Sequence, residues 1–242
     1  MRLASLFSKE KYSLVDVDIH SHLIPAIDDG AKDMARSIEL ILSLKEMGYK
    51  KLITTPHVSD MFPNCSKDIL RGYQALKLEL EKREIDIELE VAAEYYADKN
   101  FEELLNTQDL LTFGEKKYLL FELSYFTPQH DLESLVYDIK LAGYTPVLAH
   151  PERYIYLHDN INKYRDIKSI GVLFQINLTS IANYYSEEVK KNVKSLVLNG
   201  MVDFIGSDAH HRQHIKFLKK SFSKSLYKKI FKYNKILNNT LL

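Results

Sequence analysis

Several features are scarce in this sequence of 242 residues, and each scarcity excludes a class of protein. A single cysteine, Cys65, excludes an intrachain disulfide framework and favours a reducing compartment. Lys and Arg together number 33, as do Asp and Glu, so no net charge indicates a nucleic-acid partner. No apolar run reaches the roughly 18 residues of a transmembrane helix, and the apolar patch within Met1–Lys11 is too short for a signal peptide. The chain is therefore predicted to be a cytoplasmic globular protein.

Hydrophobic residues make up 45% of the chain, and short apolar segments alternate with segments of helical periodicity. Strands are expected at Leu14–Ile19, Lys51–Thr55, Ile87–Ala92, Tyr118–Phe121, Thr145–Leu148, Val172–Ile176 and Val202–Ile205. Helices are expected at Ala31–Met47, Ser66–Arg83, Lys99–Leu105, Asp131–Leu141, Glu187–Leu198 and in a segment that ends with Tyr164–Ser169. Repeated strand–helix units predict a parallel sheet, and about seven units in this length favour a closed barrel. No change of composition resembles a linker, so residues 1–242 are expected to form one α/β domain.

The charge is unevenly distributed along the chain. Residues 209–242 contain nine basic side chains and no acidic one, so the preceding part carries 24 basic and 33 acidic residues. Phe222, Leu226 and Ile230 recur at a spacing of four, which predicts a basic amphipathic helix from about residue 211. This helix either packs its apolar stripe on the acidic body or contacts an anionic membrane or an acidic partner.

Imidazole or carboxylate side chains follow six of the seven expected strands. They are His20 and His22, His57, Glu94, Glu122, His150, and the pair Asp208 and His210, whereas Asn177 follows the sixth strand. The carboxyl ends of barrel strands converge on one face, where such folds place their chemistry. A lone His57 or Glu122 is more often a hydrogen-bonded neighbour of the core. The whole set, however, favours a shared site.

This set has the chemistry of a metal centre. Carboxylates crowded at one mouth repel one another unless cations lie between them. Imidazole and carboxylate ligands without thiolate suit Mn, Fe or Zn, and so many candidates could hold more than one ion. His20 and His22 are alternate residues at a strand end, so both rings can reach one ion.

Seven short segments together resemble a known family. They are Asp18-Ile19-His20-Ser21-His22, Asp28-Asp29-Gly30, Thr55-Pro56-His57, Ala93-Glu94-Tyr95-Tyr96, Phe121-Glu122-Leu123-Ser124, Ala149-His150-Pro151-Glu152-Arg153-Tyr154 and Gly206-Ser207-Asp208-Ala209-His210. In order and spacing they resemble the polymerase-and-histidinol-phosphatase (PHP) superfamily, and within it the bacterial tyrosine-protein phosphatases of the capsule and exopolysaccharide type. The resemblance covers Asp16 to about Arg212 and implies a distorted seven-stranded, TIM-like (β/α) barrel with two or three divalent metals.

The resemblance also implies a role for each matching residue. One metal would be held by His20, His22, Glu94 and Asp208; a second by Glu94, Glu122 and His150; and a third by His57, His210 and a carboxylate from Asp28 or Asp29. The catalytic residues would be Arg153, Asp29 and Arg212. Arg153 would face the substrate phosphate. Arg212 matches less well, because the loop after His210 differs from the longer Gly- and Pro-containing loop of family members.

The implied function is metal-dependent hydrolysis of phosphotyrosine monoesters, with Mn as the expected metal and Fe or Zn as alternatives. The implied substrate is the phosphotyrosine-rich tail of a bacterial tyrosine kinase that controls capsular or exopolysaccharide synthesis, with at most indirect contact with the membrane. The alternatives are a small-molecule phosphatase of the histidinol-phosphate type, a nuclease-like phosphodiesterase and a non-catalytic metal-binding regulator. The balanced charge disfavours a nuclease, and the complete ligand set disfavours a regulator.

Two other patterns bear on this hypothesis. Cys65 and Arg71 have the Cys-x5-Arg spacing of cysteine-dependent tyrosine phosphatases, which hold phosphate in a loop of backbone N–H groups. Asp68 would place a negative charge in that loop and Ser66 is a helix-capping residue, so the match is interpreted as coincidence. Several tyrosines also follow strands, and those on loops could line a rim that stacks on a phosphotyrosine ring; they are Tyr95, Tyr96, Tyr125, Tyr154, Tyr156, Tyr184 and Tyr185.

Overall fold

The computed structural model describes residues 12–242, so the apolar patch in Met1–Lys11 lies outside the described residues. The strands are β1 (Val17–Asp18), β2 (Lys51–Thr54), β3 (His57–Val58), β4 (Glu88–Val91), β5 (Glu94–Tyr96), β6 (Tyr118–Glu122), β7 (Thr145–Ala149), β8 (Leu173–Asn177) and β9 (Phe204–Gly206). The pairings between these strands are parallel, in the orders β1-β2-β4 and β3-β5-β6-β7-β8-β9. Each expected strand is therefore present.

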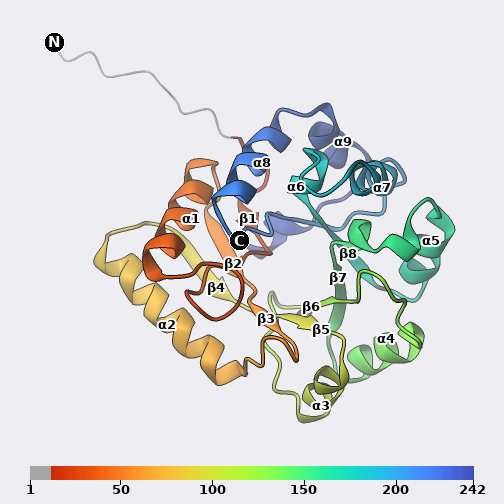
Figure 1. Ribbon diagram of the computed structural model, residues 1–242, viewed down its shortest axis with the longest axis horizontal. Helices are drawn as coiled ribbons and strands as arrows, with labels where there is room; N and C mark the ends of the chain where they lie inside the picture. The colour runs from red at the N-terminus through yellow and green to blue at the C-terminus, as the bar shows by residue number, and fades with distance from the viewer. Residues whose placement is uncertain (1–11) are drawn as a thin grey trace.

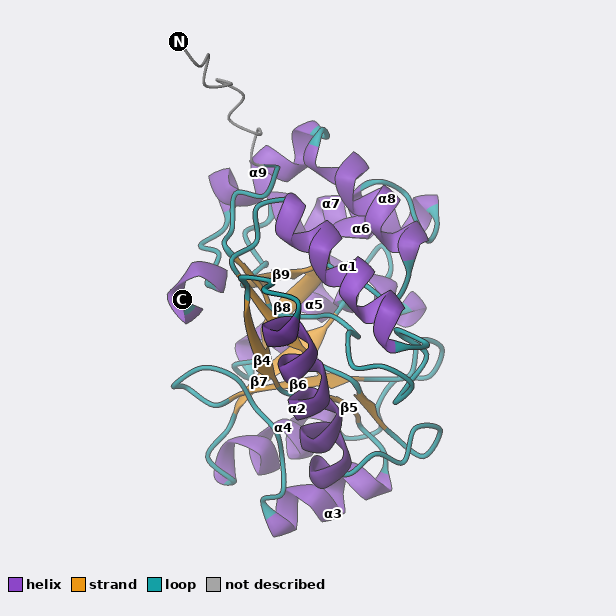
Figure 2. Cartoon of the chain, turned by 90° about the vertical axis from the view of Figure 1, so that its left-hand side faces the viewer, coloured by secondary structure: helices purple, strands orange, loops and turns teal. Residues whose placement is uncertain are grey.

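Helices surround these strands (Figures 1 and 2). They are α1 (Met34–Glu46), α2 (Ser66–Lys82), α3 (Lys99–Thr107), α4 (Leu132–Leu141), α5 (Ile161–Ser169), α6 (Leu178–Ile181), α7 (Glu187–Leu198), α8 (Arg212–Phe222) and α9 (Ser225–Tyr233), with short 3-10 turns η1 (Pro151–Arg153), η2 (Ile155–Leu157) and η3 (Asn238–Leu241). Side-chain caps define several starts: Asp33 accepts from the N–H of Arg36 at α1, and Ser186 accepts from that of Val189 at α7. No helix of residues 12–242 is both long and apolar enough to cross a membrane.

Two of the expected strands are followed by a second short strand that the sequence pattern did not predict. β2 pairs with β1 and β4, whereas β3, beyond Pro56, pairs with β5. Pro56 has no N–H to donate to a ladder, and its carbonyl accepts from the N–H of Glu94. The chain therefore changes partners at this point, and His57 and Glu94 lie on strands instead of on loops.

The first and last strands meet and close the barrel. Ser21 and Ala209 form an isolated parallel bridge, the N–H of Asp208 donates to the carbonyl of His20 over 2.8 Å, and the N–H of His22 donates to that of Ala209 over 3.1 Å. This seam joins the β1 and β9 ends of the two sheets. The structure confirms the predicted α/β barrel architecture, and the seam places residues near both ends of the sequence side by side.

The basic C-terminal segment is two helices where one was expected. Lys224, between α8 and α9, has an extended backbone (φ −79°, ψ 140°), which interrupts the helix. Phe222, Tyr227 and Ile230 are buried, and the exposed lysines lie on the outer faces. Beyond α9, the buried side chain of Asn238 bonds to the carbonyl of Val17 and to both backbone polar groups of Ile205. The segment therefore packs on the barrel, and Asn238 links β1 to β9 by hydrogen bonds.

Candidate metal centre

A cavity of about 690 Å³ lies at the carboxyl ends of the strands. Its lining includes Asp29, His57, Glu94, Glu122, His150, Asp208 and His210, seven of the ten metal ligands expected from the sequence. His20, His22 and Asp28 lie behind this surface and contact its residues. The barrel thus brings together side chains that are spread over about 190 positions of the sequence, as parallel strands require.

Four groups of these side chains have ligand atoms close enough to share an ion. They are His20, His22 and Asp208; His20, Glu94 and His150; His57, Glu94 and Glu122; and His22, Asp29, His57 and His210. Within each group the candidate ligand atoms lie within 4.8 Å of one another. The groups overlap through His20, His22, His57 and Glu94, so the cluster suits several ions that share ligands.

Glu94 lies at the middle of the cluster. Its Oε2 is 3.1 Å from Nε2 of His20 and 3.2 Å from Nδ1 of His57, and its Oε1 is 2.9 Å from Nε2 of His150. The two carboxylate oxygens therefore face different imidazoles. A carboxylate in this position can bridge two cations, one on each oxygen.

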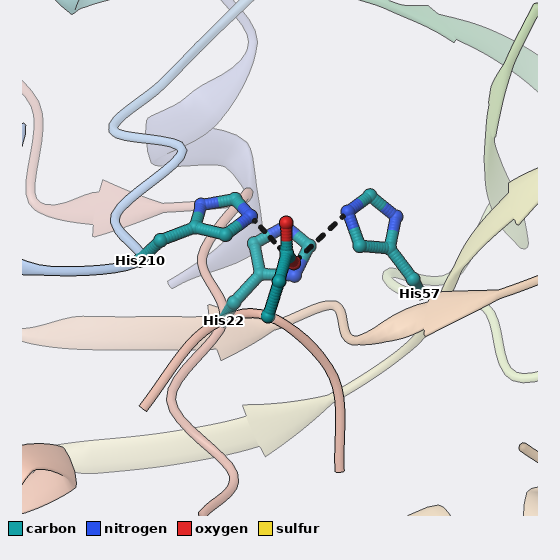
Figure 3. A group of neighbouring side chains, drawn as sticks. His22, His57 and His210 are labelled. Carbon is teal, nitrogen blue, oxygen red and sulfur yellow. Dashed lines mark ion pairs between the residues drawn. The ribbon is translucent and has the colours of Figure 1, made fainter. Parts of the chain in front are cut away.

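The more open end of the cluster contains three histidines and Asp29. Figure 3 shows the rings of His22, His57 and His210 turned toward a common point. Oδ1 of Asp29 lies 3.3 Å from Nε2 of His210 and 3.6 Å from Nε2 of His57, and the Asp29 side chain is 58% exposed. Its exposure makes Asp29 the ligand candidate nearest to solvent.

The sequence left open whether Asp28 or Asp29 reaches this group, and the structure separates the two. Oδ2 of Asp28 accepts from Nδ1 of His22 over 2.8 Å and from the N–H of His57 over 3.0 Å. A Cβ on Gly30 would lie 2.4 Å from the carbonyl oxygen of His22, so only glycine permits this turn. Asp29 thus belongs to the candidate ligand group, whereas Asp28 holds the His22 ring from behind.

The electrostatics of the cluster favour bound cations. Burial lowers the pKa of His20, but the charges of Glu94 and Asp208 outweigh burial and raise it to about 9. Burial raises the pKa of Glu94, and the charge of His20 then brings it well below its usual value. Without metal, the carboxylates are thus compensated by protons on the imidazoles. Divalent ions bound to the same atoms would displace these protons, as imidazole and carboxylate donors allow, so the residues present fit a metal centre.

Two ligand candidates have unusual backbone conformations. His150 has φ 35° and Asp208 has φ 49°, and both side chains are buried. Residues other than glycine in this left-handed region cost about 1–3 kcal/mol each and cluster at functional sites. Both residues lie just beyond strand ends, and both side chains line the cavity.

The three predicted catalytic residues differ in position. The Arg153 guanidinium lies between the rings of Tyr125 and Tyr185, 4.4 and 4.3 Å from their centroids, and lines the cavity. Asp29 lines the cavity as described. Arg212 instead pairs with Glu39 of α1 and lines a neighbouring cavity of about 470 Å³. The structure therefore brings Arg153 and Asp29, but not Arg212, to the cluster.

The Cys-x5-Arg segment forms no phosphate cradle. Arg71 donates to Asp68 over 2.8 Å, and the exposed thiol of Cys65 lies 3.1 Å from the other Asp68 oxygen. The segment is the first part of α2, as expected. Cys65 is the residue before the helix and makes no side-chain cap, so the expected capping by Ser66 is wrong.

The sequence analysis named the tyrosines of the site only as members of a larger candidate set, and it missed other residues altogether. Tyr96, Tyr125, Tyr184 and Tyr185 line the cavity, whereas Tyr95 and Tyr154 are buried in the core. Phe62 stacks on His57 with its ring centroid at 5.5 Å. Gln175 was also missed, although it stands two residues before Asn177 and therefore faces the same side of its strand.

Known proteins resemble this chain over most of its length. The family model described as "Capsular polysaccharide synthesis, CpsB/CapC" matches residues 16–237. Tyrosine-protein phosphatase YwqE of Bacillus subtilis is 32% identical over 196 residues, 81% of this chain and 77% of YwqE. Tyrosine-protein phosphatase CpsB of Streptococcus agalactiae is 29% identical over 201 residues, 81% of this chain and 83% of CpsB.

The fold resemblance is of the same kind. A structure from the study of YwqE of Bacillus subtilis and CpsB of Streptococcus pneumoniae, described as unique metal-dependent tyrosine phosphatases, superposes with a TM-score of 0.76. Its sequence identity is 29%, over 91% of this chain and 96% of that one. An amidohydrolase from Mycoplasma synoviae, 14% identical, superposes with a TM-score of 0.51 over 96% of this chain and 87% of its own, and shares the fold alone.

Proposed function

Because the chain belongs to the CpsB/CapC family of capsular polysaccharide synthesis, we propose that it is a metal-dependent protein-tyrosine phosphatase that hydrolyses phosphotyrosine monoesters. One observation carries the proposal most directly. The imidazole and carboxylate cluster around buried Glu94 lies in the same cavity as Arg153, a guanidinium fixed between two tyrosine rings. A cation centre beside a fixed guanidinium suits a phosphoryl group, whose oxygens carry negative charge.

The proposed ligands form three sets. His20, His22, Glu94 and Asp208 would hold one ion; Glu94, Glu122 and His150 a second; and His57, His210 and Asp29 a third. Manganese is the proposed metal, with iron or zinc as alternatives, since oxygen and imidazole donors suit all three. When bound, such ions would supply Lewis acidity and lower the pKa of the water that attacks phosphorus.

Arg153 is proposed to bind the phosphoryl oxygens. Its Nη1 lies 3.5 Å from Oδ2 of Asp208. Burial lowers the pKa of Arg153, but Tyr185, Tyr125 and Asp208 together outweigh burial and raise it, so the guanidinium stays charged. Its Cζ lies over the rings of both Tyr125 and Tyr185, and these cation–π contacts hold the guanidinium in place. Because the Arg153 side chain is already held in one conformation, it can orient the phosphate without losing further conformational freedom.

The walls of the cavity suit an aryl ester. Met61, Phe62, Tyr96 and Tyr184 line it, and Met61 is 81% exposed at its rim. An aromatic ring in this position would stack on these side chains and exclude water from the buried ligands below. His20 and Glu94 are fully buried, so a phosphate on a long, rigid side chain reaches the cluster more readily than one on serine. A phenolate also leaves with little need for protonation.

The proposed physiological substrate is the phosphotyrosine tail of a bacterial tyrosine kinase that controls capsule or exopolysaccharide synthesis, and the proposed location is the cytoplasm. The family description supports the capsule role, and the names of the relatives support a phosphotyrosine substrate. The single, exposed and unpaired cysteine is compatible with a reducing compartment.

A substrate panel tests the proposal. The protein is stripped of metal, reconstituted separately with Mn²⁺, Fe²⁺ or Zn²⁺, and assayed on a phosphotyrosine peptide, the matched phosphoserine peptide and histidinol phosphate. We expect the phosphotyrosine peptide to be hydrolysed with a kcat/KM at least 100-fold above the other two. Preference for histidinol phosphate would make the protein a small-molecule phosphatase, and no turnover of any substrate by metal-loaded protein would contradict the enzymatic proposal.

A further inference from the structure

Strand β8 is the one expected strand whose end carries no imidazole or carboxylate, yet it contacts the cluster through two buried amides. Gln175 and Asn177 alternate along β8 and therefore face the same side. Oε1 of Gln175 lies 2.7 Å from Nδ1 of His20, Nε2 of Gln175 donates to Oδ1 of Asn177 over 2.9 Å, and Nδ2 of Asn177 donates to Oδ2 of Asp208 over 2.6 Å. The two amides thus connect two ligand candidates.

The orientation of both amides follows from the carboxylate at one end. An ionised carboxylate only accepts hydrogen bonds, so the NH2 group of Asn177 faces Asp208. The carbonyl oxygen of Asn177 must then face Gln175, which turns the NH2 group of Gln175 to Asn177 and its carbonyl oxygen to His20. Nδ1 of His20 must therefore carry the hydrogen. Nε2, which faces Glu94 and Asp208, is then the nitrogen whose proton a metal would displace, and its lone pair would bind the ion.

The same contacts divide the two oxygens of Asp208. Oδ2 accepts from Asn177, from the hydroxyl of Tyr185 over 3.2 Å, and lies 3.5 Å from Nη1 of Arg153. Oδ1 has the imidazoles around it, 3.5 Å from Nε2 of both His20 and His22. Asn177 thus occupies the oxygen that faces away from the imidazoles, and Oδ1 stays available to an ion.

Gly206 on β9 leaves the space that these amides need. A Cβ at this position would lie 2.7 Å from Cβ of His20 and 2.8 Å from Nε2 of Gln175. Real Cβ atoms do not approach other heavy atoms so closely, so any larger residue would push His20 and Gln175 apart. The backbone φ of Gly206 does not require glycine, which leaves this close approach as the reason for it.

We propose that Gln175 and Asn177 form an amide relay on β8 that prepares the centre for metal, by fixing the ring tautomer of His20 and the free oxygen of Asp208. Both are positioning residues, and the inference rests on the proposed metal centre. Partners of this kind typically change metal affinity by about 10–100-fold when they are removed.

Metal affinity of the full chain tests the relay. Gln175→Met keeps the volume of the side chain and removes both hydrogen bonds, so we expect it to bind Mn²⁺ about 10–100-fold more weakly than the wild type in competition with a chelator. Gln175→Glu keeps an acceptor for Nδ1 of His20 but loses the donor to Asn177, so its affinity should lie between the two. Gly206→Ala should weaken binding as well, and it provides an independent variant if Gln175→Met does not fold.

The matched control is Asn192→Leu on α7. Asn192 is also a buried amide, and it bonds to the N–H of Asp159 and the carbonyl of Glu188, outside the cavity. Its loss should lower the melting temperature and leave Mn²⁺ affinity unchanged. In zinc-loaded wild type, long-range ¹H–¹⁵N correlations of His20 should show a protonated Nδ1.

The possible results distinguish a failure of the relay proposal from a failure of the proposed metal centre. Wild-type affinity in Gln175→Met, an equal loss in Asn192→Leu, or a metal on Nδ1 of His20 would overturn the relay while the proposed phosphatase stands. A wild type that binds no divalent ion would overturn the metal centre, and the relay with it.

Discussion

At the scale of single residues, Glu94 determines how the imidazoles of the cavity are held together. Its two oxygens contact His20, His57 and His150, so the loss of this one side chain would affect three candidate ligands at once. We expect Glu94→Ala to lose most bound metal and to lower kcat by at least about 100-fold, because it removes the carboxylate that is proposed to be shared by two ions. Elemental analysis and initial rates measure both effects, with exposed Glu133→Ala as the control. Full metal content in Glu94→Ala would contradict the assigned cluster; His20→Ala and Asp208→Ala should behave as Glu94→Ala does.

The thiol of Cys65 should be dispensable. It is exposed, lies beside Asp68 and does not line the cavity, so Cys65→Ser should keep kcat/KM within about twofold of the wild type. A chelator should instead abolish turnover of an aryl phosphate, and added Mn²⁺ should restore it. Activity that survives chelation but not the serine substitution would mean that the nucleophile is the thiol.

Asp18 makes the stability of the fold depend on pH. Burial raises its pKa to about 6, against an ordinary value of 3.8, although hydrogen bonds from Ser207 and the charge of His20 oppose this. The folded state holds the proton more tightly than the unfolded state, so stability present below pH 4 is lost as the pH rises to 6. Relative to the wild type, Asp18→Asn should therefore gain about 2–3 kcal/mol of unfolding free energy between pH 4 and pH 7.

Urea denaturation of the metal-free proteins at several pH values measures this difference. A difference between Asp18→Asn and the wild type that stays constant from pH 4 to pH 7 would show that Asp18 has the same pKa in both states.

The ligand candidates could be predicted from the sequence because each follows an apolar strand, and parallel strands end on one face. The choice between Asp28 and Asp29 could not, since it depends on how one turn folds around Gly30. Gln175 was missed because a single polar residue within a buried strand gives no sign of its partner, which lies 155 positions away. Arg212 was placed at the site only by a weak match to the family pattern in the loop after His210, but its side chain turns to Glu39 instead.

At the scale of elements, the strands were predictable from their apolar runs, and their interruptions were not. Pro56 marks the end of β2, but the pairing of β3 with β5 depends on a distant carbonyl–amide contact with Glu94. The break between α8 and α9 at Lys224 likewise could not be predicted, because the apolar spacing continues from one helix into the next. Periodicity reports which face is apolar and does not report where the backbone bends.

The turn η3, which follows α9, should contribute strongly to the stability of the barrel. Asn238 satisfies three buried backbone groups, one on Val17 and two on Ile205. Asn238→Ala would leave them without partners, so we expect a loss of about 2–4 kcal/mol of unfolding free energy, measured by denaturant titration. Exposed Thr240→Ala, from the same turn, should cost less than about 0.5 kcal/mol. Equal losses in the two variants would mean that the Asn238 bonds stabilise nothing beyond the turn.

At the scale of the whole molecule, the acidic body and the basic C-terminal helices predict charge effects on rate more than on stability. Lys224, Lys228 and Lys232 are exposed, so replacing all three by Gln should change the melting temperature by less than about 2 °C. At low ionic strength, the triple variant should turn over a strongly acidic phosphotyrosine peptide more slowly than the wild type does. In high salt the two rates should be equal, because screening removes the electrostatic attraction between the lysines and the peptide.

The matched control places the same three substitutions on α2, at Lys67, Lys77 and Lys82, which are also exposed. An equal fall in rate from that triple variant would assign the effect to net charge alone. A large drop in melting temperature in the first variant would show that these lysines hold α8 and α9 to the body.

The seam between β1 and β9 has a consequence for how the protein is made in the cell. His20 and His22 leave the ribosome early relative to Asp208 and His210, which complete their cluster across the seam and are added about 190 codons later. At about 5–20 residues per second, the nascent chain spends roughly ten seconds or more with its early histidines unmatched. A ribosome-bound fragment therefore lacks the assembled centre, and the chain can take up its full complement of metal only after synthesis has passed its last strand.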